Sequence, residues 1–230
     1  MELLHSIDFW IGLLKIVWIN IILSGDNAVV IALAARSLPL GQQNRAVLWG
    51  SGAAVVLRIA LTVVAAKLLA LSFLQIAGGL LLLWIGVQLL SENDEGDGHF
   101  KESGNLMAAV RTILIADLVM SLDNVIAVAA AAKGDLTLLI LGLAISIPLV
   151  IFGSTLMMKL MARFPVIVTF GAALIGWVGG ETIVSDVALK DALAGLPWIH
   201  YVAAGVGAAL VVGLGRMLQK RQVQGHQESN

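Results

Sequence analysis

The chain has 230 residues, of which 59% are hydrophobic and 13% charged, and its formal net charge is −1. A soluble domain carries about 25% charged and about 45–50% apolar residues, so this composition excludes a sizeable water-soluble catalytic domain. It also excludes an outer-membrane barrel, whose strands alternate apolar and polar residues in runs of about ten. The sequence therefore predicts an all-α, polytopic membrane protein.

Seven apolar segments follow one another along the chain, and each is close to the roughly 20 residues that a membrane-spanning helix needs. We expect these seven transmembrane helices at residues 9–35, 45–69, 72–90, 106–132, 136–158, 165–184 and 198–216. They form one transmembrane domain, 1–216, followed by a cytoplasmic tail, 217–230, which is polar and expected to be disordered after Lys220. Turn-rich residues 37–44 form the first connection, and residues 91–104 form a long acidic loop.

Lysine and arginine are unevenly divided between the two sides that seven spans define. One side holds nine of them: Arg36, Arg45, Lys101, Arg111, Lys159, Arg163, Arg216, Lys220 and Arg221. The other side holds three: Lys67, Lys133 and Lys190. Because cytoplasmic loops carry the excess of positive residues, we expect the C-terminus in the cytoplasm and the N-terminus outside.

The sequence repeats itself. Residues 22–35 read ILSGDNAVVIALAA and residues 119–132 read VMSLDNVIAVAAAA, so a Ser-x-Asp-Asn motif recurs at an offset of 97. Each copy holds three spans, and an odd number of crossings inverts the second copy relative to the first. Inverted repeats of this kind are common in secondary transporters, whose sites lie near the midplane. The copies cover residues 9–90 and 106–184, and the seventh span, 198–216, has no partner.

Both motifs place carboxylates inside apolar segments, where a charge costs about 2.5–3.5 kcal/mol and is by default a functional candidate. Carboxylate and amide oxygens suit a hard divalent cation such as Mn²⁺, Mg²⁺ or Ca²⁺. The chain has no cysteine and its four histidines lie at span ends, in a loop or in the tail, which argues against Zn²⁺ and Cu⁺. The candidate metal residues are Asp26, Asn27, Asp117, Asp123 and Asn124.

Helical spacing groups the neighbouring polar residues on one face of each span. Asn20, Ser24 and Asn27 share one face, and Asp117, Ser121 and Asn124 share the equivalent face. The aspartates of the motifs point about 100° away on an ideal helix, so full convergence requires a distorted helix. Gly25 makes a break plausible in the first span, whereas Leu122 gives no such help in the second motif.

Arg58 is the charged residue near the middle of the second span, so the aspartates have a purely structural alternative. A buried carboxylate could simply pair with this arginine. One arginine cannot neutralise three aspartates, so we interpret Arg58 as an internal counter-ion and the remaining negative charge as a cation site. Gln88 and Glu181 occupy equivalent positions of the two copies, where they either line the pathway or are interfacial.

The motif pair LSGDNAVVIALAAR and MSLDNVIAVAAAAKGD resembles the TerC family of bacterial integral membrane proteins. The length, the acidic central loop and the seven-span pattern resemble its short YjbE-type branch, over nearly the whole chain. The resemblance implies a multi-pass protein of the bacterial inner membrane, similar in plan to the LysE-type exporter superfamily. It also implies Mn²⁺ efflux, with Asp26, Asn27, Asp123 and Asn124 as metal-site residues. Asp117 has no charged counterpart, because Asn20 stands at the equivalent position.

We therefore expect a secondary transporter that exports a divalent cation, with Mn²⁺ as the favoured substrate and proton exchange as the coupling. Two alternatives stay open. One is a membrane scaffold or stress-response component that recruits partners through the 91–104 loop and the C-terminal tail, and the other is an exporter of an amino acid. No HExxH, GxSxG or Ser/His pairing lies in a span, so we expect no enzyme.

The expected partners follow from the same reasoning. They are a divalent metal ion, carried as substrate, and the lipid bilayer, with no nucleic acid and no bound cofactor. Whether the chain forms a homodimer is left open.

Overall fold

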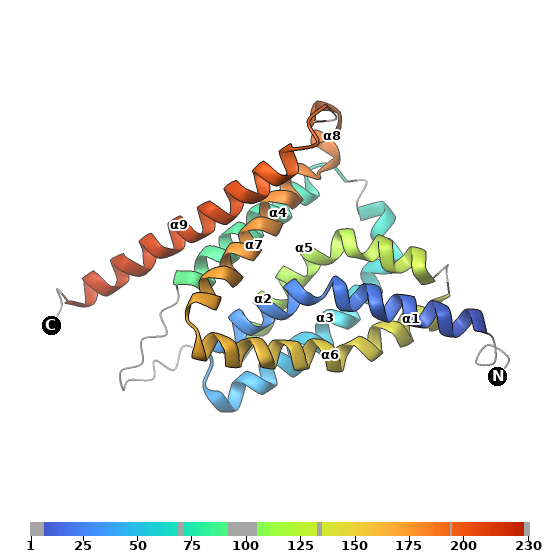
Figure 1. Cartoon of the computed structure of the whole chain (residues 1–230), viewed down its shortest axis with the longest axis horizontal. Helices are drawn as coiled ribbons and strands as arrows, with labels where there is room; N and C mark the ends of the chain where they lie inside the picture. Colours follow the sequence, from blue (N-terminus) through green and yellow to red (C-terminus); the bar gives the residue numbers. More distant parts are fainter. Residues whose placement is uncertain (1–6, 69–70, 92–104, 133–134, 194, 228–230) are drawn as a thin grey trace.

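The computed structural model describes residues 7–68, 71–91, 105–132, 135–193 and 195–227, and these residues form an all-helical protein (Figure 1). Some side chains within the helices, that of Asp123 among them, lie outside the described part. The helices are α1 (Ile7–Ile22), α2 (Gly25–Arg36), α3 (Leu40–Leu68), α4 (Leu74–Ser91), α5 (Leu106–Ala132), α6 (Leu136–Arg163), α7 (Val166–Val184), α8 (Val187–Leu193) and α9 (Ile199–Gln227). The predicted all-α class is confirmed.

Within the described residues, five helices are long and apolar enough to cross a membrane, and the bent pair α1–α2 makes a sixth candidate. The five are α3, α4, α6, α7 and α9. Helix α5 coincides with the predicted fourth span and has 27 residues, which corresponds to about 40 Å at 1.5 Å per residue. A membrane protein with several spans is thus confirmed, while the count of seven stays a prediction.

Two segments that we expected to be irregular are helical. The connection predicted at 37–44 is mostly helix, because α3 begins at Leu40. The carbonyl of Pro39 accepts the N–H of Gln42 at 2.7 Å, and a proline with its fixed φ suits the start of a helix. The disordered tail predicted after Lys220 is wrong as far as Gln227, where α9 ends. Its Lys, Arg and Gln residues are good helix formers, so polarity alone was a poor guide.

The first predicted span is broken at its Ser-x-Asp-Asn motif. Helix α1 ends at Ile22, α2 begins at Gly25, and the two axes are bent by 48°. Ser24, between them, has φ −109° and ψ 0°, and its side chain makes no capping hydrogen bond to α2. By contrast, α5 runs without interruption through the second motif. The break therefore occurs at the motif that contains Gly25 and not at the one that contains Leu122.

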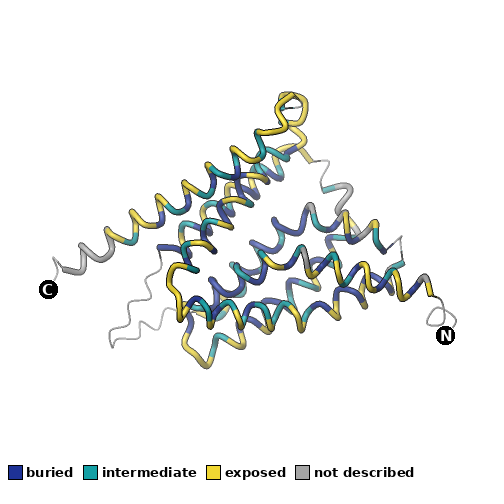
Figure 2. Tube along the Cα trace, in the orientation of Figure 1, coloured by how far each residue is buried: buried dark blue, intermediate teal, exposed yellow. Residues whose placement is uncertain are grey.

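The helices form two groups that meet at an angle (Figure 1). One group, which we call the five-helix group, contains the bent pair α1–α2 with α3, α5 and α6, and the other contains α4, α7 and α9. The bent pair packs against α6, α3 packs against α5, and α4 packs against α7. Buried residues line the faces on which the helices meet, and exposed ones line the outer faces (Figure 2). Large apolar side chains such as Trp84 and Phe152 are among the exposed residues, as expected of a bundle that faces lipid.

Glycines allow α7 and α9 to approach closely. A Cβ atom added at Gly176 would collide with the backbone oxygen of Gly207, and one added at Gly180 would collide with that of Ala203. Gly176 and Gly180 on α7, and Ala203 and Gly207 on α9, are each separated by three residues. This small-xxx-small spacing lets helix backbones pack tightly inside membranes. The predicted seventh span thus packs on α7 and α4 rather than on the five-helix group.

Asp186 joins the starts of α4 and α8. Its buried carboxylate accepts the backbone N–H groups of Phe73 at 2.9 Å, Gln75 at 3.0 Å, Ile76 at 3.2 Å and Ala188 at 2.8 Å. Phe73 has φ 70°, a left-handed conformation that non-glycine residues adopt rarely. Desolvation by burial raises the pKa of Asp186, but the four backbone donors outweigh it and lower the pKa below its ordinary value.

Candidate functional site

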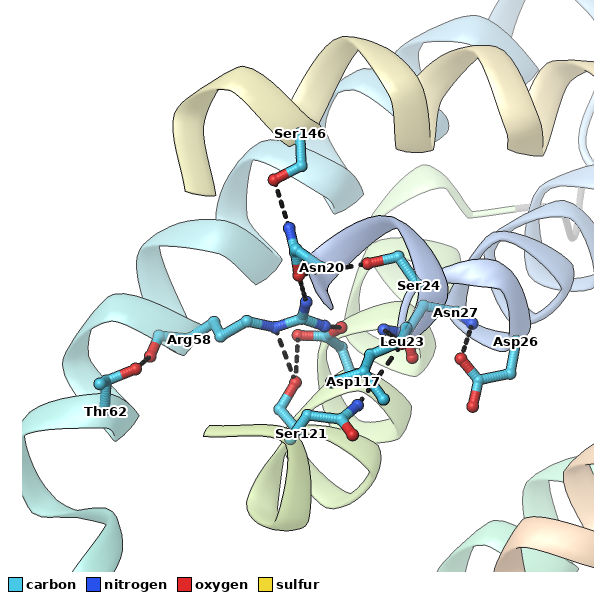
Figure 3. A network of polar contacts seen from close by, with 11 residues as sticks. Asn20, Leu23, Ser24, Asp26, Asn27, Arg58, Thr62, Asp117, Ser121 and Ser146 are labelled. Atoms are coloured by element: carbon cyan, nitrogen blue, oxygen red, sulfur yellow. Dashed lines mark hydrogen bonds and ion pairs between the residues drawn. The ribbon is translucent and has the colours of Figure 1, made fainter. Parts of the chain in front are cut away.

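A network of buried polar side chains lies inside the five-helix group and is centred on Arg58 of α3 (Figure 3). Its guanidinium donates from Nη2 to Oδ1 of Asp117 at 2.6 Å, and from Nη1 to Oδ1 of Asn20 at 2.7 Å. Its Nε donates to Oγ of Ser121 at 3.0 Å. Arg58 is 4% exposed and Asp117 is 5% exposed. One arginine side chain therefore connects α1, α3 and α5 in the interior of the protein.

Hydrogen bonds among its partners extend the network to the helix break and to α6. Nδ2 of Asn20 donates to Oγ of Ser146, a buried serine of α6. Ser24, at the break, donates to Oδ1 of Asn20 at 3.3 Å. On α5, Ser121 donates to Oδ2 of Asp117 at 3.2 Å. The predicted polar faces of the first and fourth spans thus face each other, and Arg58 lies between them.

The asparagines of both motifs meet at the backbone of the break. Nδ2 of Asn27 lies 3.4 Å and Nδ2 of Asn124 lies 3.5 Å from the carbonyl oxygen of Leu23, to which both donate. Leu23 sits between α1 and α2, where the last carbonyls of a helix have no partner within the helix. The break therefore exposes a backbone oxygen to the side chains of both motifs.

Oδ1 of Asn27 is buried and accepts no hydrogen bond from the part of the chain that the structure describes. Leaving a buried acceptor unpaired costs about 1–3 kcal/mol, so such an atom calls for an explanation. An occupant that the protein binds at this point would supply the missing partner. The other unpaired buried atom among the described side chains is Oγ of Ser51 on α3.

Asp26 lies in the first turn of α2, beside the Arg58 network but outside it. Its Oδ1 accepts the backbone N–H of Asn27 at 2.8 Å, and its side chain is partly exposed. In Figure 3 it lies on the opposite side of Asn27 from Arg58. Its carboxylate forms no ion pair with the described residues. The Asp26 carboxylate is thus held by the first turn of α2 and is not paired with Arg58.

The structure brings most of the predicted site residues together but leaves two apart. Asn20, Ser24, Asp26, Asn27, Arg58, Asp117, Ser121 and Asn124 all lie in or beside the network. Gln88 and Glu181 are exposed on α4 and α7, in the other helix group. The backbone of Asp123 lies in α5 next to Asn124, and its side chain lies outside the described residues.

Of the two roles considered for the buried aspartates, a structural ion pair and a cation site, Asp117 has the first in this structure. Arg58 is the counter-ion of Asp117, as the sequence suggested, and it does not contact Asp26. Among the described residues, no three His, Cys, Asp or Glu side chains lie close enough together to hold a metal ion. The metal site that combines Asp26, Asn27, Asp123, Asn124 and Asp117 therefore stays a prediction.

Ser146 and the carbonyl of Leu23 were missed from the sequence. A single serine in a long apolar segment does not form a recognisable motif, and the sequence does not show which backbone carbonyl a helix break will expose. A signal for Ser146 was present, because it lies four residues after Gly142 on the same helix face. Small and hydroxyl residues at this spacing mark helix interfaces in membranes, and a Cβ at Gly142 would indeed collide with the side chain of Ile16.

Fold and network together define a class of protein. It is an all-helical integral membrane protein whose charged and amide side chains meet inside a bundle of apolar helices. The chain belongs to the TerC family of integral membrane proteins, whose sequence profile matches residues 5–223. The family predicted from the two motifs is therefore confirmed.

Individual relatives agree with this membership. The uncharacterized membrane protein YjbE of Bacillus subtilis is 49% identical over 78% of this chain and 82% of its own length. YkoY, another uncharacterized membrane protein of Bacillus subtilis, is 27% identical over 88% of this chain and 70% of its own. The UPF0053 inner membrane protein YoaE of Escherichia coli is 24% identical over all of this chain, which spans 46% of that protein. No solved structure matches the chain.

Proposed function

We propose that the chain is a secondary transporter that exports a divalent cation, with Mn²⁺ as the favoured substrate, through the centre of the five-helix group. The observation that carries this proposal is the buried oxygen of Asn27, which has no partner among the described residues. The Nδ2 group of the same side chain donates to the carbonyl of Leu23, and the backbone N–H of Asn27 donates to the carboxylate of Asp26. A cation bound at this oxygen would supply its missing partner.

The chemistry of these groups favours a hard divalent ion. Carboxylate, amide and backbone oxygens are the ligands that Mg²⁺, Ca²⁺ and Mn²⁺ prefer. Broken helices of secondary transporters offer unwound carbonyls to cations in the same way. At the break, the C-terminal end of α1 carries a partial negative charge of about one half, and Asp26 in the first turn of α2 offsets the partial positive charge of that helix's N-terminus. From the sequence, Asp123 and Asn124 of the second motif complete the proposed ligand set.

The packing of the helices supports the inverted repeat on which transport would depend. If residues 9–90 and 106–184 are copies, the bent pair and α5 are their first spans, α3 and α6 their second, and α4 and α7 their third. The first span of each copy then packs on the second span of the other, and the third spans pack on each other. A pseudo-twofold axis requires this reciprocity. Rocking of the copies around the site would give access to the two sides in turn.

The same geometry argues against an amino acid as substrate. Its carboxylate would need a cation or a helix N-terminus inside the membrane. Arg58 already donates to Asp117, Asn20 and Ser121. The N-terminus of α2 is engaged as well, because Asp26 accepts one of its N–H groups. The scaffold alternative depends on the C-terminal tail, which continues α9 as far as Gln227, and on the 91–104 loop, of which residues 92–104 lie outside the described part of the chain.

Flux measurements test the proposal directly. Purified protein in proteoliposomes is expected to move Mn²⁺ when a pH gradient is imposed, and Asp26→Asn combined with Asp123→Asn is expected to abolish this flux. Asp191→Asn, which removes an exposed carboxylate on α8, serves as the matched control. Deleting residues 92–101 is expected to leave flux intact. Mn²⁺ flux that survives the double substitution would remove the two motifs from the transport site.

A further inference from the structure

We infer that the Arg58–Asp117 ion pair sets the charge of the cation that the proposed site accepts. The inference rests on the proposed function and adds a selectivity-determining role for two residues outside the ligand set proposed above, since both oxygens of Asp117 already accept hydrogen bonds. The pair is buried, and both carboxylate oxygens of Asp117 are occupied: Oδ1 accepts a hydrogen bond from Arg58 and Oδ2 accepts one from Ser121.

Charge balance inside the five-helix group follows from this pairing. The proposed ligand set takes Asp26 from the structure and Asp123 from the sequence, and together with Asp117 and Arg58 these four side chains carry a formal charge of −2. The other cations on α1 and α5, Lys15 and Arg111, are exposed and stay outside this balance. Because Arg58 cancels Asp117, the formal charge of the two motif aspartates in the proposed ligand set equals and opposes that of one divalent ion.

The network also links the pair mechanically to the proposed site. Arg58 donates to Asn20, and Asn20 accepts a hydrogen bond from Ser24. Asn20 and Ser24 flank the segment that contains Leu23, whose carbonyl accepts hydrogen bonds from the asparagines of both motifs. The guanidinium therefore holds the backbone of the break in place while it neutralises Asp117, so it acts on charge and on position at once.

Removing one member of the pair changes the interior charge by one unit. Asp117→Asn leaves Arg58 uncancelled and brings the charge to −1, which disfavours a divalent ion. Arg58→Met leaves Asp117 uncancelled and brings the charge to −3, which favours a trivalent ion. Arg58→Met combined with Asp117→Asn restores −2. At the short distances and low dielectric of a buried site, one charge changes an affinity by at least about tenfold.

Equilibrium binding of Na⁺, Mn²⁺ and La³⁺ to the purified full-length chain tests the inference, through competition for the change in tryptophan fluorescence. The wild-type protein is expected to prefer Mn²⁺. Asp117→Asn should lower the affinity for Mn²⁺ at least about tenfold relative to the affinity for Na⁺. Arg58→Met should raise the affinity for La³⁺ by a similar factor relative to the affinity for Mn²⁺. The double variant should return to the wild-type order. Arg45→Met, at an exposed arginine of the same helix, is the matched control.

The outcomes separate the two proposals. Affinity ratios measured on one preparation do not depend on the folded fraction, so partial unfolding does not imitate a change in selectivity. If neither single variant folds, a double variant that loses the wild-type preference for Mn²⁺ overturns the inference. Unchanged ratios in every variant overturn the selectivity role alone. A wild-type chain that binds none of the three ions overturns the proposed function and this inference with it.

Discussion

Nη2 of Arg58 lies 2.6 Å from Oδ1 of Asp117, and the two side chains are only 5% and 6% exposed. Few arrangements are as costly to disturb, because removing one partner of a buried pair leaves a charge without compensation. This pair joins α3 to α5, and the same guanidinium reaches Asn20 on α1. The interior of the five-helix group is thus organised around a charge pair rather than around apolar packing alone.

We predict that Asp117→Asn destabilises the protein by about 3–5 kcal/mol, the usual cost of breaking a buried ion pair. Thermal unfolding in detergent, followed by far-ultraviolet circular dichroism, measures the loss. The double variant Arg58→Met with Asp117→Asn should recover most of it, since no unpaired charge remains. A double variant less stable than both single ones would show that the hydrogen bonds to Asn20 and Ser121 matter more than the charges.

We predict a different signature for Asn27→Ala. The substitution removes an oxygen that has no partner among the described residues and one hydrogen bond of 3.4 Å. Stability should therefore change by less than about 1 kcal/mol, while Mn²⁺ affinity should fall at least about tenfold. Ser51→Ala is the matched control, because its buried oxygen is also unpaired but lies outside the proposed site. Equal binding by Asn27→Ala and wild type would argue that Oδ1 is not a ligand.

We predict that Gly180→Leu separates α9 from α7. A side chain at this position collides with the backbone of Ala203, which cannot move aside as a flexible side chain would. Overpacking of this kind costs about 1–3 kcal/mol or more. Gly205→Ala on α9, where an added Cβ meets no atom within 4 Å, should leave stability unchanged. Limited proteolysis of the α8–α9 connection measures the difference, and equal cleavage of the two variants would contradict the prediction.

We predict that Asp186 stabilises the start of α4 only while it is ionised. Its folded pKa is lowered, so its contribution is present above the ordinary value of 3.8 and is lost as pH falls through the folded pKa. The protection factors of the Phe73, Gln75 and Ile76 amides against hydrogen exchange, taken relative to unprotected amides at the same pH, should therefore fall below pH 3.8. Asp186→Asn should show low protection factors at pH 7 and little further change in them on acidification. Slow exchange in this variant at pH 7 would show that the carboxylate does not hold these amides.

Much of the candidate site could be predicted because it depends on local spacing. Asn20, Ser24 and Asn27 recur at i, i+4 and i+7, and helical geometry alone places them on one face. Arg58 could be predicted as a counter-ion because a deep arginine among carboxylates has few other options. Gly25 correctly indicated which of the two motifs would interrupt its helix.

The remaining features depend on tertiary packing. Ser146 joins the network because α6 packs beside α1. The periodicity of one span does not indicate which other helix will pack against it. The pairing of Arg58 with Asp117 instead of Asp26 was open for the same reason. It is decided by the bend at Leu23, after which Asp26 lies on the far side of Asn27. The length of α9 was missed because its last turns are polar, and polarity does not end a helix that has good helix formers.

The central claim is that a divalent cation binds at the helix break, and the position of Mn²⁺ in crystals of the full-length protein tests it most directly. Diffraction data collected at the manganese absorption edge locate the ion without reference to its ligands. We predict one anomalous peak within coordination distance of Oδ1 of Asn27 and the carbonyl oxygen of Leu23, lost in Asp26→Asn combined with Asp123→Asn. A peak elsewhere in the bundle, or no peak at saturating Mn²⁺, would contradict the account.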